Sequence, residues 1–141
     1  MLPRIIVILA AGLALGGCVA ATPPPLQTLV HDEKRYGPEE RFRGILHLGF
    51  ETSAFLVPGD GTRAWVEAGP TVSRRIAEAA PEIFRPPAGS EHPISWFNIV
   101  FTGRRSLEAG RFGHLGAYRQ QVLVTRIHSL RRRSPPPFPR T

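Results

Sequence analysis

The sequence of 141 residues is long enough for one small domain, and its 42% hydrophobic and 21% charged residues are typical of a globular chain. Its single cysteine excludes an internal disulfide and a zinc site built from several thiolates. The formal net charge is +7, and Lys34 is the only lysine among eighteen basic residues. Such an arginine-rich chain is suited to binding phosphate or carboxylate groups, which includes nucleic acid.

The first seventeen residues have the pattern of an export signal. Arg4 precedes the uncharged apolar run IIVILAAGLAL, and two glycines follow that run. A basic start, a short apolar segment and small residues describe a secretory signal peptide. The alternative, a membrane-spanning anchor, needs about 20 apolar residues, and this run is shorter. Export also argues against nucleic acid as a partner.

The segment LGGC at residues 15–18 resembles the lipobox of bacterial lipoproteins. The resemblance implies that residues 1–17 are removed and that Cys18 carries the acyl chains attaching the protein to the lipid bilayer. Several acyl chains hold a protein durably where one binds only marginally. Val19, in place of an aspartate, implies the outer membrane, with the protein facing the periplasm. The alternative is an ordinary signal peptide with an incidental cysteine.

Composition divides the remaining chain into three segments. Residues 18–40 are predicted to be the lipidated cysteine and a flexible tether, residues 41–130 the folded domain, and residues 131–141 a basic, proline-rich disordered tail. About ninety residues can support a small core unaided. The arginine run 131–133 is predicted either to be solvated or to attach to anionic lipid headgroups, lipopolysaccharide phosphates or an acidic protein.

The folded part is predicted to consist mainly of β-strands. Apolar and polar residues alternate over residues 41–50, which places Phe42, Leu46, Leu48 and Phe50 on one face of a strand. Glycines in this run indicate bends. Four more strands are predicted at residues 53–57, 63–67, 96–103 and 118–130.

One helix is predicted between Pro70 and Pro81, with Val72, Ile76 and the alanines 79 and 80 on its apolar side. Three strands, a helix and two strands are the element order of the OB-fold, a five-stranded, partly open Greek-key barrel. We therefore predict a mainly β chain forming a small five-stranded OB-like barrel with its helix between strands three and four. A different small β-barrel or roll with one helix is the alternative.

Two short motifs, GFETSAF at residues 49–55 and GRFGHLGAY at residues 110–118, resemble a group of small, uncharacterised proteobacterial lipoproteins. Their single domain is similar to the OB-like C-terminal domain of copper-resistance and envelope-stress outer-membrane lipoproteins. The resemblance covers residues 41–130 and implies no catalytic residue. That family often has Pro-Cys-Gly where this chain has Val57, Pro58 and Gly59, so thiol chemistry and copper ligation are not carried over.

No enzymatic chemistry is predicted, and neither a metal nor another cofactor is expected. No two of the five histidines have the one-turn helical spacing of a metalloprotease site. His47 and His128 fall within predicted strands, where pairing can bring them together, but isolated strand histidines are usually solvated. Trp65 and Trp96 are predicted to pack in the core or on the barrel face.

The predicted function is that of a non-catalytic, membrane-anchored lipoprotein of unknown molecular activity, which binds or supports envelope proteins or anionic envelope polymers. The alternative is an OB module that binds a small anionic or oligosaccharide ligand through the loop 110–118. In that loop Arg111, His114 and Tyr118 are the candidate ligand-binding residues. Its glycines can equally form turns whose apolar side chains only cap the barrel.

The lipid attachment is tested by replacing Cys18 with alanine. We expect Cys18→Ala to abolish labelling of the protein with radioactive palmitate in growing cells, because the acyl chains depend on this thiol. Unchanged labelling, or a purified wild-type chain that still begins at Met1, would contradict lipidation.

Overall fold

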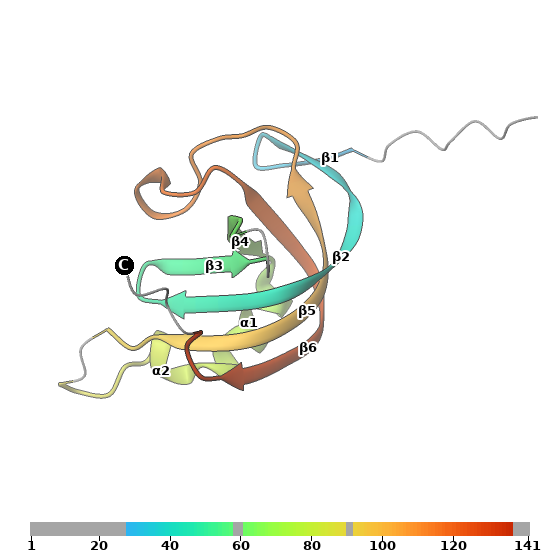
Figure 1. Ribbon diagram of the computed structural model, residues 1–141. Helices are drawn as coiled ribbons and strands as arrows, with labels where there is room; N and C mark the ends of the chain where they lie inside the picture. The colour runs from blue at the N-terminus through green and yellow to red at the C-terminus, as the bar shows by residue number, and fades with distance from the viewer. Residues whose placement is uncertain (1–27, 58–60, 90–91, 137–141) are drawn as a thin grey trace, which may run out of the picture.

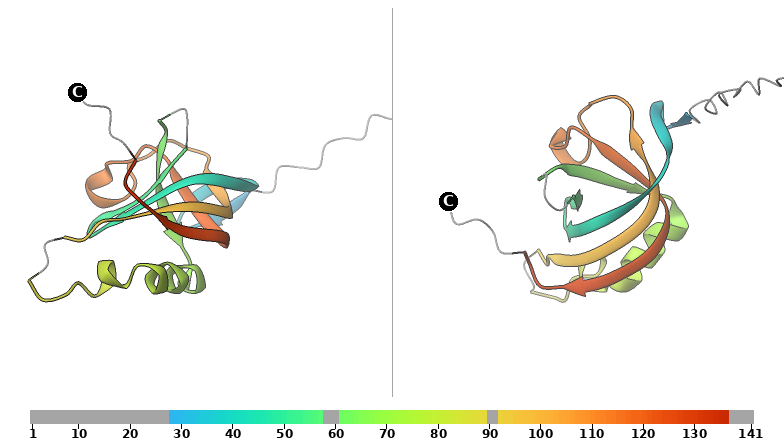
Figure 2. Two further views of the ribbon diagram at one scale, coloured as in Figure 1. Left: turned by 60° about the horizontal axis from the view of Figure 1, so that its bottom comes forward. Right: turned by 45° about the vertical axis from the view of Figure 1, so that its right-hand side comes forward.

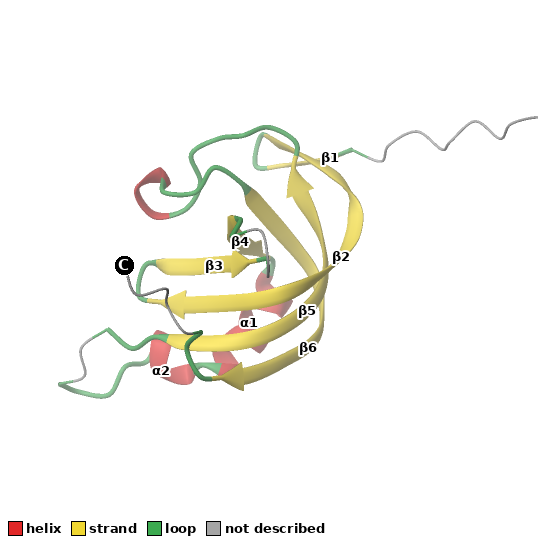
Figure 3. Ribbon diagram, in the orientation of Figure 1, coloured by secondary structure: helices red, strands yellow, loops and turns green. Residues whose placement is uncertain are grey.

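The computed structural model describes residues 28–57, 61–89 and 92–136, and these form a mainly β structure (Figure 1). Strand propensity and apolar alternation produce one sheet of six strands, with two helices beside it (Figure 3). The strands are β1 (Leu29–His31), β2 (Lys34–Gly49), β3 (Thr52–Leu56), β4 (Arg63–Ala68), β5 (Ser95–Ser106) and β6 (Gln121–Arg133). The helices are α1 (Pro70–Ala79) and α2 (Pro81–Phe84), and a single 3-10 turn covers His114–Gly116.

The strand β2 organises the sheet because it pairs along both of its edges. One edge is antiparallel to β3 and the other is antiparallel to β5. β4 is antiparallel to β3 and parallel to β6, and β6 is antiparallel to β5. The strand order is therefore β1-β2-β3-β4-β6-β5, and β5 pairs back with β2. The strongly curved strands are visible in the two views of Figure 2.

Gly44 lies where this curvature brings β2 against β3. A Cβ atom at this position would be 2.4 Å from the Leu56 carbonyl oxygen and 2.5 Å from the Phe55 ring. Only glycine allows that approach without displacing backbone. The bend expected from glycines in residues 41–50 is thus explained by close contact of two strands.

The core is formed by inward-facing side chains of the sheet and the apolar side of α1. The rings of Phe42 and Phe101 stack with their centroids 4.9 Å apart, and Phe55 meets Phe101 edge-on. Val72 and Ile76 of α1 are buried against the same cluster, as their helical spacing predicted. The main buried cluster extends from Phe42 to Ile127, within the stretch predicted to fold, whereas the buried Tyr36 precedes that stretch.

Three expectations from the sequence are wrong. The strands begin before residue 41, since β1 and the first part of β2 pair with each other, so the described part of the predicted tether, from residue 28, is mostly strand. Tyr36 is fully buried there. The sheet consequently has six strands rather than five. Phe50 is 68% exposed because β2 ends at Gly49 and Phe50 lies in the turn that follows.

The arginine run at residues 131–133 also differs from the prediction, because it continues β6 as a strand. The remainder of the tether (residues 18–27), Cys18, the signal segment and residues 137–141 of the tail lie outside the described residues.

Within this run Arg132 is held by the helical side of the molecule. Its guanidinium lies 2.7 Å from a carboxylate oxygen of Glu82, donates to the Ala79 carbonyl at 2.9 Å and lies over the Phe97 ring. Glu82 also accepts a hydrogen bond from the Ser95 hydroxyl. These hydrogen bonds, from Arg132 first and Ser95 second, lower the pKa of the Glu82 carboxyl from 4.5 to about 2.

Glu82→Gln should lower the free energy of unfolding at neutral pH, because it removes a carboxylate that the fold prefers ionised. A folded-state pKa of about 2 against 4.5 means that this stabilisation is present above pH 4.5 and is lost as the pH falls towards 2. Denaturant titrations of wild type and variant should therefore converge over that interval. Glu78→Gln, an equal charge change at an exposed position of α1, should alter the free energy by less than about 0.5 kcal/mol at every pH. A wild-type advantage that persists at pH 2 would contradict the assignment.

Candidate functional site

The loop 110–118 closes on itself between β5 and β6. Backbone hydrogen bonds join Phe112 and Tyr118 in both directions, at 2.9 and 3.2 Å. The Phe112 side chain is buried, whereas Leu115 at the tip is 81% exposed and has a positive φ of 54°. The loop is therefore a compact turn with a buried base and an exposed tip.

Trp65 of β4 fixes the position of this loop. Gly113 has φ 70° and ψ −167°, a region that essentially only glycine occupies. A Cβ atom on Gly113 would be 2.3 Å from the indole of Trp65. The Tyr118 ring packs against the same indole, with centroids 5.6 Å apart.

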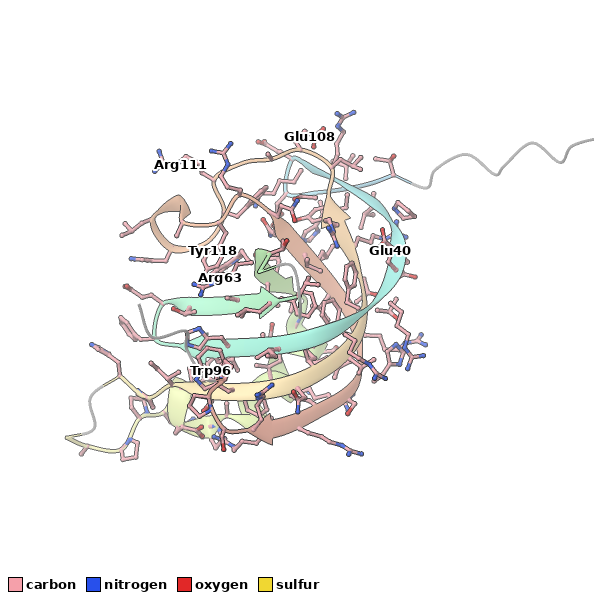
Figure 4. All side chains as sticks on the ribbon, in the orientation of Figure 1. Glu40, Arg63, Trp96, Glu108, Arg111 and Tyr118 are labelled. Carbon is pink, nitrogen blue, oxygen red and sulfur yellow. The ribbon has the colours of Figure 1, made fainter. Side chains whose placement is uncertain are left out.

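The three predicted ligand-binding residues contact different partners. Arg111 donates to the Leu115 carbonyl within its own loop at 3.4 Å. The imidazole of His114 lies 3.0 Å from a carboxylate oxygen of Glu51, in the turn between β2 and β3. Tyr118 packs on Trp65. Arg111 and Tyr118 lie on the same side of the molecule in Figure 4. In these contacts His114 and Tyr118 join the loop to Glu51 and Trp65, and their ligand-binding role stays a prediction.

Glu51 and Trp65 both line a pocket of about 300 Å³, which the strand register explains. Pairing of β3 with β4 stops at Ala54 opposite Trp65. The same register would place Ser53 opposite Val66, but the two strands diverge there. The divergence leaves a space between the β2–β3 turn and the C-terminal half of β4.

The pocket combines an apolar base with aromatic and acidic edges. Its base includes Val66 of β4 and Ile76 of α1. Phe50 and Phe84 are exposed aromatic rings at its edge, and Glu67 is one of its carboxylates. The complete lining is Leu48, Gly49, Phe50, Glu51, Thr52, Ser53, Trp65, Val66, Glu67, Ala68, Ser73, Ile76, Ile83 and Phe84. Arginine and lysine are absent from this set of described residues.

A second aromatic pair lies on the outer face of the sheet. His47 of β2 stacks on Trp96 of β5, with ring centroids 4.0 Å apart and planes 3° apart. Burial first, and the charge of Arg63 second, lower the pKa of the His47 imidazole. Trp96 is 7% exposed, which is consistent with its predicted role in packing, whereas Trp65 also lines the pocket.

The described histidines do not form a common site. His128 is hydrogen-bonded to the Thr102 hydroxyl at 2.7 Å, and β5 separates its strand from that of His47. Among the described residues, no group of three or more His, Cys, Asp or Glu side chains could hold a metal ion. None of the described helices has the length and apolar character needed to cross a membrane.

Comparisons with protein-family models, curated proteins and solved structures found no match for this chain. The resemblance to small envelope lipoproteins therefore stays a prediction.

The pocket residues, none of which belongs to the loop 110–118, do not stand out in the sequence. Alternation places Phe50 on the inner face of a strand, and Glu51 belongs only to a resembling motif. The single signal in the sequence is Gly49, since a glycine can interrupt a strand and leave the aromatic residue after it exposed in a turn, where such side chains are candidates for binding. Their convergence with Trp65 and α1 depends on the divergence of β3 and β4.

The contact between the loop and Trp65 is tested with Gly113→Ala. Both the backbone strain and the collision with the indole should destabilise the protein, by about 2 kcal/mol or more in free energy of unfolding. Gly61→Ala is the matched control, because Gly61 also has a positive φ, of 69°, but a Cβ atom there would have nothing within 4 Å. It should cost about 1 kcal/mol through backbone strain alone. Equal losses for the two variants, measured by denaturant unfolding, would show that the Trp65 contact contributes nothing.

Proposed function

We propose that this protein is a non-catalytic binding module of the cell envelope, anchored in the membrane through Cys18 and facing the periplasm. The lipobox-like segment at residues 15–18 supports the anchor and its compartment. The observation that carries the binding role is the pocket between the β2–β3 turn, β4 and α1, beside the loop 110–118. A preformed apolar pocket with a few polar groups is the usual form of a small-molecule site.

The proposal includes an OB-type barrel for the domain. Two pairing features and one feature of the chain order support it: β2 pairs with both β3 and β5, β4 is parallel to β6, and α1 lies between β4 and β5 in the chain. Removing the short β1 leaves five strands with a helix between the third and the fourth, the element order of that fold. In OB barrels the loop between the last two strands commonly borders the ligand face, and here that loop contacts two pocket residues, Glu51 and Trp65.

An oligosaccharide fits the pocket better than an anionic ligand does. The carboxylates of Glu51 and Glu67 accept hydrogen bonds and repel anions, and no described cation lines the pocket. Hydroxyl groups of a sugar donate to carboxylates in charge-assisted hydrogen bonds. The apolar faces of sugar rings can pack on the exposed rings of Phe50 and Phe84. The specific ligand class we propose is therefore a neutral, polyhydroxylated glycan segment.

Thermal unfolding in the presence of soluble, uncharged oligomers of N-acetylglucosamine tests this function. Binding to the folded state alone should raise the melting temperature, and stabilisation of about 2.7 kcal/mol corresponds to a ligand at 100 times its dissociation constant. Phe50→Ala and Glu51→Gln should each reduce this stabilisation, because they remove a stacking surface and an acceptor.

The matched control is Leu107→Ala, which also truncates an exposed apolar side chain but lies outside the pocket. It should retain the full shift. Absence of any shift for wild type, or an equal reduction in all three variants, would contradict a glycan site in this pocket.

A further inference from the structure

The outer face of β2, β5 and β6 carries two columns of basic side chains. Register places Arg43 of β2 opposite Val100 of β5, and Val100 opposite Ser129 of β6. Arg131 lies opposite Asn98 in the next outward-facing row. Neighbouring strands are about 4.8 Å apart, so the β2 and β6 columns are separated by about 10 Å, with β5 between them.

These columns border an open trough of about 710 Å³ whose lining contains five basic side chains and no acid among the described residues. The basic members are Arg41, Arg43, His128, Arg131 and Arg133. We call this set the basic trough. Along its centre β5 contributes the uncharged Asn98 and Val100. An anion above β5 can therefore be approached by guanidinium groups from both sides.

The charges of the basic trough are not neutralised within the described structure. None of the ion pairs found among the described residues involves Arg41, Arg43 or Arg131. Arg133 donates to the Asn98 side-chain oxygen at 3.2 Å, so it leans over β5. The nearby Glu39 of β2 accepts a hydrogen bond from Thr125 at 2.8 Å.

Arg132 does not belong to the basic trough, although it lies between two of its members in sequence. Alternation along β6 sends Arg131 and Arg133 to the outer face and Arg132 to the helical side, where Glu82 holds it. Arg132 therefore binds Glu82, whereas Arg131 and Arg133 of β6 join Arg41 and Arg43 of β2 on the outer face.

We propose that the basic trough docks the domain onto the phosphate groups of an anionic phospholipid bilayer. Guanidinium groups bind phosphate oxygens through paired hydrogen bonds, and arginines keep their charge at any physiological pH. The trough is open and extends across three strands, so it presents several cations to several phosphates at once. A bilayer supplies phosphates in such an array, and each nearby basic residue contributes about 1 kcal/mol of attraction to an anionic surface.

The proposed anchor at Cys18 would keep the domain close to a membrane, and this supporting argument rests on the proposed function. Docking through the basic trough is independent of the glycan pocket, because the two are lined by different residues.

The test uses a chain beginning at Val19, which lacks the acylated cysteine but contains every described strand, helix and core residue. The fraction of this chain that sediments with mixed phosphatidylglycerol and phosphatidylcholine vesicles is compared with the fraction that sediments with vesicles of phosphatidylcholine alone. We expect salt-sensitive binding to the anionic vesicles only. The double variant Arg41→Gln/Arg131→Gln should bind about 25-fold more weakly, at about fivefold for each lost charge.

The matched control is Arg74→Gln/Arg85→Gln, which makes the same charge change at exposed positions on and beside the helices. It should bind within about twofold of wild type, since long-range effects of distant charges are screened. Equal weakening in both double variants would show that binding depends on net charge and not on the basic trough. Equal binding of the wild-type chain to anionic and to neutral vesicles would show that binding is not electrostatic. Either result would overturn the proposal. Tighter binding to a single-stranded DNA oligonucleotide, lost in the same trough variant, would assign the face to nucleic acid and overturn the proposal. Because no lipid anchor is present, failure here leaves the Cys18 labelling result unaffected.

Discussion

The whole arrangement depends on β2 pairing along both edges within one short stretch. Residues 45–48 are paired with β3 on one side and with β5 on the other. This requires β3 to come close to β2 at Gly44, where a side chain would collide with the Leu56 carbonyl and the Phe55 ring. The same closeness brings the rings of Phe42, Phe55 and Phe101 into one cluster. The close approach of β2 and β3 at Gly44 therefore allows both the backbone pairing of the sheet and the packing of the aromatic core.

The curved sheet also explains why the two proposed surfaces are chemically different. Where β3 and β4 diverge, the pocket is lined by aromatic rings and the carboxylates of Glu51 and Glu67. Where β2, β5 and β6 stay paired, outward positions alternate with core positions and carry the arginines of the basic trough. One surface is suited to accepting hydrogen bonds from neutral hydroxyl groups, and the other to binding phosphate. A protein held at a membrane could use both without competition between them.

The loop 110–118 links the sheet to the pocket through packing contacts. Gly113 allows Trp65 to lie against the loop backbone, and His114 reaches Glu51 at 3.0 Å. Changes in the loop should therefore reach the pocket through these two side chains. The sequence allows two interpretations of this loop, a turn that packs against the sheet and a loop that borders a site. The two are compatible, because Phe112 is buried, whereas His114 and Tyr118 contact the pocket residues Glu51 and Trp65.

Local sequence determined the elements that depend on short-range pattern. Alternation predicted most of the strands, and Pro70, Pro81 and the spacing of Val72 and Ile76 predicted α1. The first strands are not predicted because β1 is only three residues long and the start of β2 is polar; β1 forms by pairing with β2, and β2 by pairing with β1 and β5. Only the tertiary structure decided that Arg132 turns inward to Glu82, that Arg41 and Arg43 join Arg131, and that Phe50 lies at a pocket. The physical reason is that strand register and the divergence of β3 from β4 are long-range pairings, and a periodicity of two along one strand carries no information about which strand lies beside it.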